Sequence, residues 1–189
     1  MRSLVVMAMF ASSLADAAWN EYTETRDLAL PAVDVDILEV NAGAGSILVS
    51  GTSGASDITV KATIRVPDDD EEDAKEFIAE DLVLSLEKKR SKAKLAAYFD
   101  QGSWNSRDSA AVDLEINIPQ GLKLFIDDGS GSISIKDVGG DVGIDDGSGS
   151  IEITGAANVV VDDGSGSLRI SNVSGDVEVE DGSGDIKIR

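Results

Sequence analysis

Paired acidic residues recur in the last third of the chain, and they are the residues whose spacing could carry chemistry. Each pair opens an acidic-Asp-Gly-Ser-Gly sequence, and the four copies follow one another at intervals of 17 or 18 residues. The first acids are Asp127, Asp145, Asp162 and Glu180, and the second are Asp128, Asp146, Asp163 and Asp181. If successive copies stack as neighbouring strands, like carboxylates lie about 4.8 Å apart.

Three kinds of chemistry suit such rows of carboxylates. The first is structural: the second acid of each pair accepts the backbone N–H two residues on, in an Asx turn, at Ser130, Ser148, Ser165 and Ser183. The second is a row of Ca²⁺ ions bridging neighbouring copies, because Ca²⁺ takes six to eight oxygen ligands. The third is glycoside hydrolysis by two carboxylates about 5 to 10 Å apart.

The surrounding residues argue against catalysis. The repeats hold one aromatic residue, Phe125, and no Trp or Tyr on which a sugar could stack, and their regularity is unbroken by a distinct site. The chain has no His and no Cys, so the common general base and the thiol nucleophile are both missing. We therefore expect no enzyme and no catalytic or cofactor-binding residues, with Ca²⁺ at the Asp-Asp-Gly-Ser-Gly corners as the alternative to a purely structural role.

Each repeat predicts two short strands joined by a glycine corner. In the copy at 141–158, Val142 and Ile144 alternate with other residues before Gly147-Ser148-Gly149, and Ile151 and Ile153 alternate after it. A third apolar position recurs at Val138, Ala156 and Val173. Because repeats this short bury a core only by stacking, the pattern predicts an all-β fold: a parallel, right-handed β-solenoid with 17–18-residue coils. An antiparallel meander with Gly-Ser-Gly hairpins is the alternative.

The region before the repeats predicts the same architecture with an interruption. Residues 40–49 read as a worn copy of the repeat, with Asn41 and Ala42 in place of the acidic pair. We expect an insertion at about 67–110, with a short helix from about Asp69 to Glu80, and regular repeats over 122–189. The basic residues from Lys88 to Lys94 predict a solvated turn, or else a contact with an anionic envelope polymer.

Composition narrows the function further. The 189 residues include 36 acidic and 16 basic ones, for a net charge of −20, which argues against nucleic acid as a partner. Residues 1–17 are typical of a secretory signal peptide, with Arg2, an apolar run and the cleavage motif Ala15-Asp16-Ala17. We expect residues 18–189 to form one exported domain without a transmembrane segment, in the periplasm or at the cell surface.

The motifs of the second half resemble a known bacterial family. The run VDLEINIPQG at 112–121 precedes IDDGSGSISIKDVGGDVGIDDGSGSIEI, and Gly-Asp-Val or Gly-Asp-Ile recurs at Gly140, Gly175 and Gly184. This arrangement resembles the DUF4097, or putative adhesin, domain, strongly from Ala111 onward and loosely before it. The resemblance implies an exported β-solenoid-like domain with an envelope or surface role and no established catalytic residues.

These observations together predict a non-catalytic, adhesin-like or envelope-associated binding module whose ligand is unknown. A Ca²⁺-binding structural element is the alternative, and a carbohydrate-active enzyme is less favoured. The strand at Ile186-Lys187-Ile188-Arg189 predicts an open sheet edge that adds a strand from a second copy or an envelope partner. Alternatively, the N-terminal segment or the loop around Trp104 folds over this edge.

Overall fold

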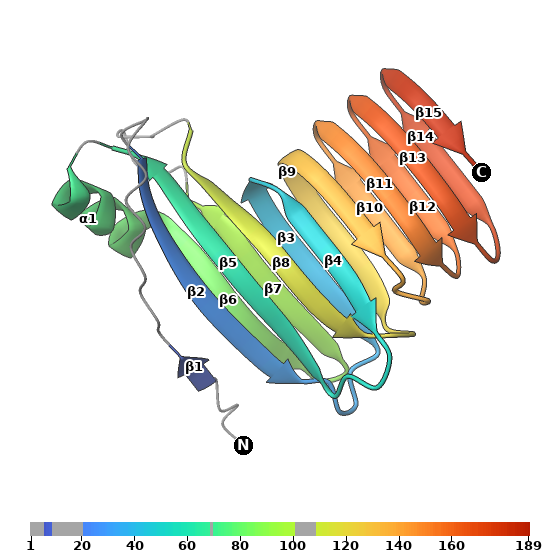
Figure 1. The fold of residues 1–189 in the computed structure, drawn as a ribbon, viewed down its shortest axis with the longest axis horizontal. Coiled ribbons are helices and arrows are strands. Elements are labelled where there is room, and N and C mark those ends of the chain that lie inside the picture. The colour runs from blue at the N-terminus through green and yellow to red at the C-terminus, as the bar shows by residue number, and fades with distance from the viewer. Residues whose placement is uncertain (1–5, 9–20, 69, 101–108) are drawn as a thin grey trace.

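The computed structural model describes residues 6–8, 21–68, 70–100 and 109–189. The predicted signal peptide therefore lies outside the described residues, apart from 6–8, and so does the loop around Trp104. The described strands form one hydrogen-bonded sheet that folds into two layers around a single core (Figure 1).

The first layer begins with antiparallel strands and ends with parallel ones. β2 pairs antiparallel with β5, β5 pairs antiparallel with β8, and the pairs from β8 onward are parallel. In spatial order the layer contains β1 (Val6–Ala8), β2 (Glu21–Pro31), β5 (Asp57–Pro67), β8 (Ala111–Pro119), β4 (Ile47–Thr52), the second half of β9 (Lys123–Lys136), β11 (Gly149–Ala156), β13 (Gly166–Val173) and β15 (Gly184–Ile188).

The second layer has one antiparallel pair, at its β6 edge. In spatial order it contains β6 (Leu82–Lys89), β7 (Lys92–Phe99), β3 (Ile37–Ala44), the first half of β9, β10 (Val142–Asp146), β12 (Val159–Asp163) and β14 (Val177–Asp181). β9 bends at Gly129-Ser130-Gly131 and so belongs to both layers, which joins them covalently near the middle of the molecule.

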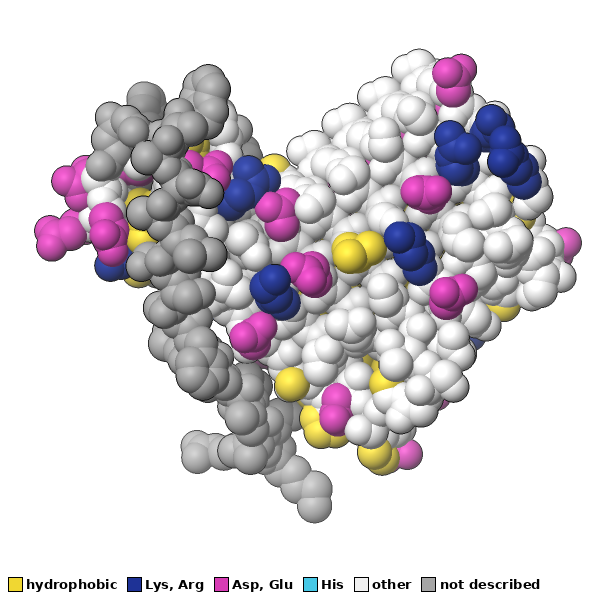
Figure 2. All heavy atoms as spheres, viewed as in Figure 1, with side chains coloured by type: hydrophobic (Ala, Val, Ile, Leu, Met, Phe, Trp, Pro, Cys, Tyr) yellow, Lys and Arg dark blue, Asp and Glu magenta, His cyan; other side chains and the backbone are white. Residues whose placement is uncertain are grey.

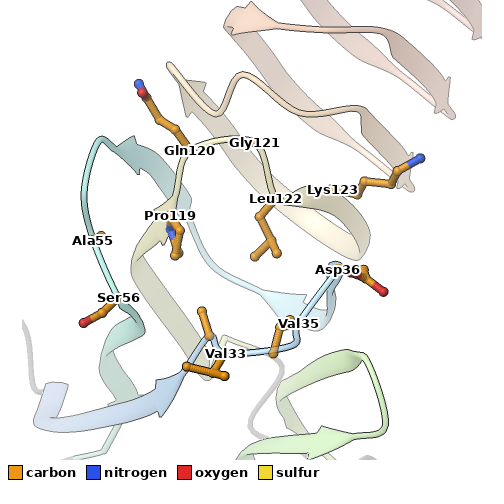
Figure 3. A pocket seen from close by; sticks show the side chains of 11 residues that line it. Val33, Val35, Asp36, Ala55, Ser56, Pro119, Gln120, Gly121, Leu122 and Lys123 are labelled. Carbon is orange, nitrogen blue, oxygen red and sulfur yellow. The ribbon is translucent and has the colours of Figure 1, made fainter.

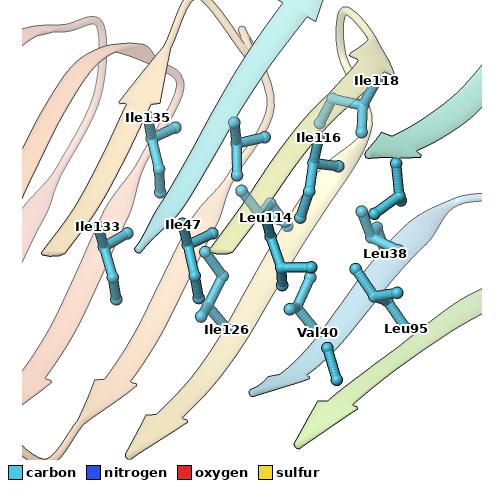
Figure 4. Packing of buried hydrophobic residues seen from close by; sticks show 14 of the residues in the cluster. Leu38, Val40, Ile47, Leu95, Leu114, Ile116, Ile118, Ile126, Ile133 and Ile135 are labelled. Atoms are coloured by element: carbon cyan, nitrogen blue, oxygen red, sulfur yellow. The ribbon is translucent and has the colours of Figure 1, made fainter. Parts of the chain in front are cut away.

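Aliphatic side chains from the two layers meet in the core, as the period-two patterns predict. Figure 4 shows Ile47, Leu114, Ile133 and Ile135 of the first layer packed near Ile126 and Val40 of the second. Within the repeats, Ile144, Ile151 and Ile153 are buried, as expected, and Val138 and Ala156 fill the third inward position. Burial decreases toward the last repeat, where Ile186 and Ile188 are about half exposed.

The all-β class with one short helix is confirmed, but the expected parallel, right-handed β-solenoid is wrong, because the sheet is mixed. β2, β5 and β8 pair antiparallel, and so do β6 and β7. The glycine corners of the repeat turn the chain after about five residues, but β2 and β5 each run for 11 residues without such a corner. The repeat of 122–189 therefore does not continue into β2, β5 and β8.

Hairpins at Gly-Ser-Gly, the alternative, are also wrong. β10 pairs in parallel with β9 and β12, and β11 pairs in parallel with β9 and β13, so the corner joins strands of different layers. The worn copy at 40–49 has the same arrangement, because its strands β3 and β4 lie in different layers and both pair in parallel with β9.

The helix α1 (Glu71–Asp81) closes one end of the molecule beside β6 (Figure 1). It begins two residues later than predicted because Asp70 is its N-cap and accepts the backbone N–H groups of Glu72 and Asp73. Ala74, Phe77 and Ile78 are buried, and the ring of Phe77 stacks on that of Phe99 with centroids 5.0 Å apart. The helix thus caps the core with its apolar side.

Candidate functional site

The second acids of the four repeats form a column across the second layer. Parallel register aligns Asp128 with Asp146, Asp146 with Asp163, and Asp163 with Asp181. The first three are buried, with exposed fractions of 4%, 2% and 1%, and Asp181 is half-buried. We call these four residues the aspartate column.

Asx turns hold three of the four carboxylates. The backbone N–H groups of Ser148, Ser165 and Ser183 donate to Oδ1 of Asp146, Asp163 and Asp181 over 3.2, 3.0 and 3.0 Å. The structural interpretation is therefore confirmed at these corners. It fails at Asp128, where neither carboxylate oxygen has a hydrogen-bond partner.

The glycine corners bring successive repeats into very close contact. A Cβ atom added to Gly149 would lie 1.6 Å from the carbonyl oxygen of Gly131, and one added to Gly166 would lie 1.5 Å from that of Gly149. Both contacts are with backbone, which cannot move aside without breaking the stack. Glycine is thus required at this corner because the chains approach closely, and this approach fixes the register of the aspartate column.

The column is electrostatically strained. Oδ2 of Asp146 and of Asp163 has no hydrogen-bond partner, in addition to both oxygens of Asp128. Burial, and then the charge of Asp146, raise the pKa of Asp128 to about 7, while the nearby N–H of Gly129 only partly opposes this rise. Burial followed by the charge of Asp163 raises the pKa of Asp146, and burial also raises that of Asp163.

The donor geometry fits a calcium cage poorly. Across the part of the chain that the structure describes, no three His, Cys, Asp or Glu side chains converge to hold a metal ion. An ion in the column would have at most two neighbouring carboxylates, so backbone carbonyls and water would have to supply most of the six to eight oxygens. The predicted calcium row therefore remains a prediction.

The first acids of the repeats point to solvent on the opposite side of the same strands. Asp127, Asp145, Asp162 and Glu180 are aligned by the same register and are all exposed. We call them the outer acidic row. Two exposed apolar side chains lie one row further along these strands: Phe125, 42% exposed, covers Gly143, and Val160 is 52% exposed.

The outer face of the first layer carries both signs of charge. One row across its strands, aligned by the register, contains Asp27, Lys61, Glu115, Leu48, Ser134, Glu152, Arg169 and Lys187. Figure 2 shows acidic and basic side chains alternating over this face, with basic ones gathered over the C-terminal strands. The two outer faces of the repeats therefore differ in charge.

A hollow of about 800 Å³ opens where the loops before β3, β5 and β9 meet (Figure 3). Val33, Val35 and Leu122 form its apolar side, and Asp36 and Lys123 lie at its rim. Val33 is 67% exposed there. No pattern in the sequence pointed to this hollow, since its lining comes from three separate loops.

The basic hairpin between β6 and β7 is partly neutralised. Lys92 and Lys94 both pair with Glu39 of β3, the latter at 2.8 Å, and Lys88 donates to the carbonyl oxygen of Val33. These pairs hold the hairpin against the second layer. The expected solvated turn is confirmed for Lys89 and Arg90, which are exposed.

Comparisons with known proteins support the fold. No protein-family model matches the chain, and no curated protein is significantly similar to it. Among solved structures, a "putative cell adhesion protein" from Clostridium sporogenes ATCC 15579 superposes with a TM-score of 0.57 at 14% identity, covering 88% of this chain and 97% of that one. The chain therefore shares the overall fold of that protein.

Two further solved structures superpose less well. A "putative lipid binding protein" from Parabacteroides distasonis ATCC 8503 gives a TM-score of 0.34 at 12% identity, with 88% and 96% of the two chains covered. A "putative adhesin" from Parabacteroides merdae ATCC 43184 gives 0.30 at 8% identity, with 88% and 96% covered. In the described ranges, no helix has the length and apolar character needed to cross a membrane.

Proposed function

We propose that this chain is a non-catalytic, adhesin-like binding module that acts outside the cytoplasm. The fold that it shares with a solved protein named for cell adhesion supports this proposal. The observation that carries it is the outer acidic row, in which β9, β10, β12 and β14 each present one exposed carboxylate. Stacked repeats give extended surfaces of this kind, and these suit extended or repetitive partners.

The positions of the carboxylates favour binding over hydrolysis. Asp128, Asp146 and Asp163 of the aspartate column are buried, so a sugar could not reach them. The outer acidic row is accessible, but it lies outside the hollow lined by Val33, Val35 and Leu122, and a glycosidase encloses its two carboxylates in a substrate cleft.

The test is adhesion of the full chain to bacterial envelope preparations and purified envelope polysaccharides. The key variant replaces Asp127, Asp145 and Asp162 with Asn, which neutralises three carboxylates of the outer acidic row. The matched control replaces Glu72, Glu76 and Glu80 of α1 with Gln, which removes the same charge at the far end of the molecule (Figure 1). We expect at least a tenfold loss of binding in the variant of the outer acidic row and none in the α1 control. Equal binding by the two variants would exclude the outer acidic row as the binding surface. If the parent itself does not bind, the proposed binding function is wrong.

Export is proposed from the sequence alone and has its own test. N-terminal sequencing of the protein from the envelope fraction of expressing bacteria should begin at Ala18, directly after Ala15-Asp16-Ala17. Recovery of the uncleaved chain in the cytoplasm would contradict this part of the proposal.

A further inference from the structure

We propose that the aspartate column binds protons, and that loss of these protons loosens the packing of the C-terminal repeats. The proposal goes beyond adhesion, since it concerns the interior of the repeats and not a binding face. It begins from four carboxylate oxygens, two on Asp128 and one each on Asp146 and Asp163, that are buried and have no partner.

A neutral carboxyl group resolves the problem that an ionised one creates here. A buried carboxylate without a compensating partner is strongly unfavourable. A protonated carboxyl group gains an O–H donor, while the carboxylate beside it offers only acceptors. Parallel register brings Asp128 beside Asp146 and Asp146 beside Asp163, so each unpartnered oxygen has a neighbouring carboxyl group with which to share a proton.

Among the residues that the structure describes, no base is placed to stabilise the ionised column instead. β10, β12 and β14 contain no basic residue. On these strands and on β9 the neighbouring titratable groups are those of the outer acidic row, together with Glu178 of β14. On the other side of Asp128, β3 contributes Ala42, which is uncharged.

The strands beyond the glycine corners add no free cation near the column. Where these strands begin, the titratable groups are Asp113 on β8 and Asp185 on β15, and Asp113 is already paired with Arg65. Lys123 and Lys136 stand at the two ends of β9 on its outer side, and Lys123 pairs with Asp141. Arg169 and Lys187 also point outward from the first layer.

The direction of the pKa shifts agrees with this geometry. The pKa of Asp128 rises to about 7, and those of Asp146 and Asp163 are also raised, mainly through burial. A raised pKa means that the folded chain holds a proton that the unfolded chain has released. The contribution of the column to stability is therefore fully present below about pH 4 and falls as the pH rises to about 7, with the unfolding constant rising up to about tenfold per pH unit for each such proton.

Unfolding of the full chain by urea at pH 5.5, 6.5, 7.5 and 8 tests the proposal. Asp128→Asn keeps the shape of a protonated carboxyl group but cannot ionise. Asp127→Asn removes the same charge from the adjacent, exposed residue and is the matched control. We expect the unfolding constant of the parent to rise at least tenfold between pH 5.5 and 7.5, the Asp127→Asn variant to do the same, and the Asp128→Asn variant to lose most of this rise.

Infrared spectroscopy detects the protonated carboxyl group directly, and this signal would not depend on pH if the column had only a structural role. The parent at pH 5.5 should show absorption from a protonated carboxyl group, which is lost at pH 8 and weakened at pH 5.5 by Asp128→Asn. If Asp128→Asn does not fold, Asp146→Asn with Asp145→Asn as its control replaces that pair.

Two results would overturn the proposal. One is an equal pH dependence in the Asp127→Asn and Asp128→Asn variants, which would show that the buried carboxyl group does not titrate in this range. The other is stabilisation of the parent, but not of Asp128→Asn, by Ca²⁺ at pH 8, which would make the column a cation site.

Discussion

Asp128 lies directly beside Ala42 in the parallel register of β9 with β3. The aspartate column therefore ends against a methyl group on one side and continues to Asp146 on the other. Ala42 belongs to the worn repeat copy, in which no acidic pair is present. The first full repeat thus packs its carboxylate against a neighbour that offers no hydrogen bond, and Asp128 is the least satisfied member of the column.

Extending the column by one carboxylate should destabilise the fold. We expect Ala42→Asp to lower the free energy of unfolding by about 2 kcal/mol or more at pH 8, because it adds a half-buried charge without a partner beside Asp128. The loss should be smaller at pH 5, where shared protons relieve the repulsion. Asn41→Asp adds the same charge on the exposed side of the strand and should change stability by less than about 0.5 kcal/mol. Urea unfolding of the parent and of both variants at pH 5 and pH 8 measures these differences.

The inward aliphatic residues of the repeats should dominate their stability. Ile151 is 1% exposed and stacks between Ile133 and Leu168. Ile151→Ala should cost about 2–5 kcal/mol, as expected for truncating a fully buried aliphatic side chain. The outward neighbour Glu152 serves as the control, and Glu152→Ala should shift the unfolding midpoint far less; a larger effect at Glu152 would contradict the observed inside and outside of β11.

The glycine corner should tolerate no side chain. Gly149→Ala places a methyl group against the carbonyl oxygen of Gly131, so we expect loss of cooperative unfolding or a cost above about 3 kcal/mol. Gly54 lies in an open turn at φ +78° with nothing within 4 Å of an added Cβ. Gly54→Ala should therefore cost only about 1 kcal/mol of backbone strain, and thermal unfolding followed by circular dichroism compares the two.

Asp113 should make the free energy of unfolding decrease at low pH. Burial acts to raise its pKa, but hydrogen bonds from Arg65 and from the backbone and hydroxyl of Ser46 outweigh this and lower the pKa overall. A lowered pKa contributes stability above about pH 4 that is lost as the pH falls further. This direction is opposite to that of the aspartate column.

Asp113→Asn should therefore cost about 1–2 kcal/mol at pH 7, and the difference from the parent should shrink below pH 3. Glu115→Gln on the same strand breaks an exposed pair with Lys61 and should cost less than about 0.5 kcal/mol. A constant deficit of Asp113→Asn at every pH would mean that the carboxylate acts through shape and not through its charge.

The sequence predicts the repeats closely because each local preference there agrees with the others. Alternation identifies Ile151 and Ile153 as inward, and the acidic residue before each glycine corner identifies the Asx turns at Asp146, Asp163 and Asp181. The same local cues could not indicate that Asp128 lacks its turn. On one side Asp128 has β3 as its neighbour, a segment about 85 residues earlier in the chain, and local cues carry no information about such a neighbour.

The direction of the strands in the N-terminal half could not be predicted from the local sequence pattern. Alternation in β5 identifies Ile58, Val60 and Ile64 as buried, but period two is the same for parallel and antiparallel neighbours. The partner of β5 on one side is β8, which comes after the helix, the β6–β7 hairpin and the loop that follows. Such pairing is decided by how the layers close around the core, so the mixed sheet could not be deduced from the repeats.

The free edge of β15 should support strand pairing between copies. Among the described strands β15 pairs only with β13, and its Ile186 and Ile188 are 49% and 52% exposed. An unpaired edge with exposed aliphatic residues favours addition of another strand. Sedimentation of the full chain at moderate salt should give an average mass that rises with protein concentration, and more steeply at higher salt, because screening reduces the repulsion due to the −20 charge.

Two matched variants distinguish pairing at the β15 edge from nonspecific association through exposed apolar side chains. Ile188→Lys places a charge on the edge strand and should keep the protein monomeric. Val160→Lys alters a side chain of equal exposure, 52%, on β12, which has neighbours on both sides, and it should associate as the parent does. If the parent has a constant monomeric mass across the whole concentration range, the edge is not an assembly surface; if Val160→Lys alone prevents association, copies meet through the outer face of the second layer instead.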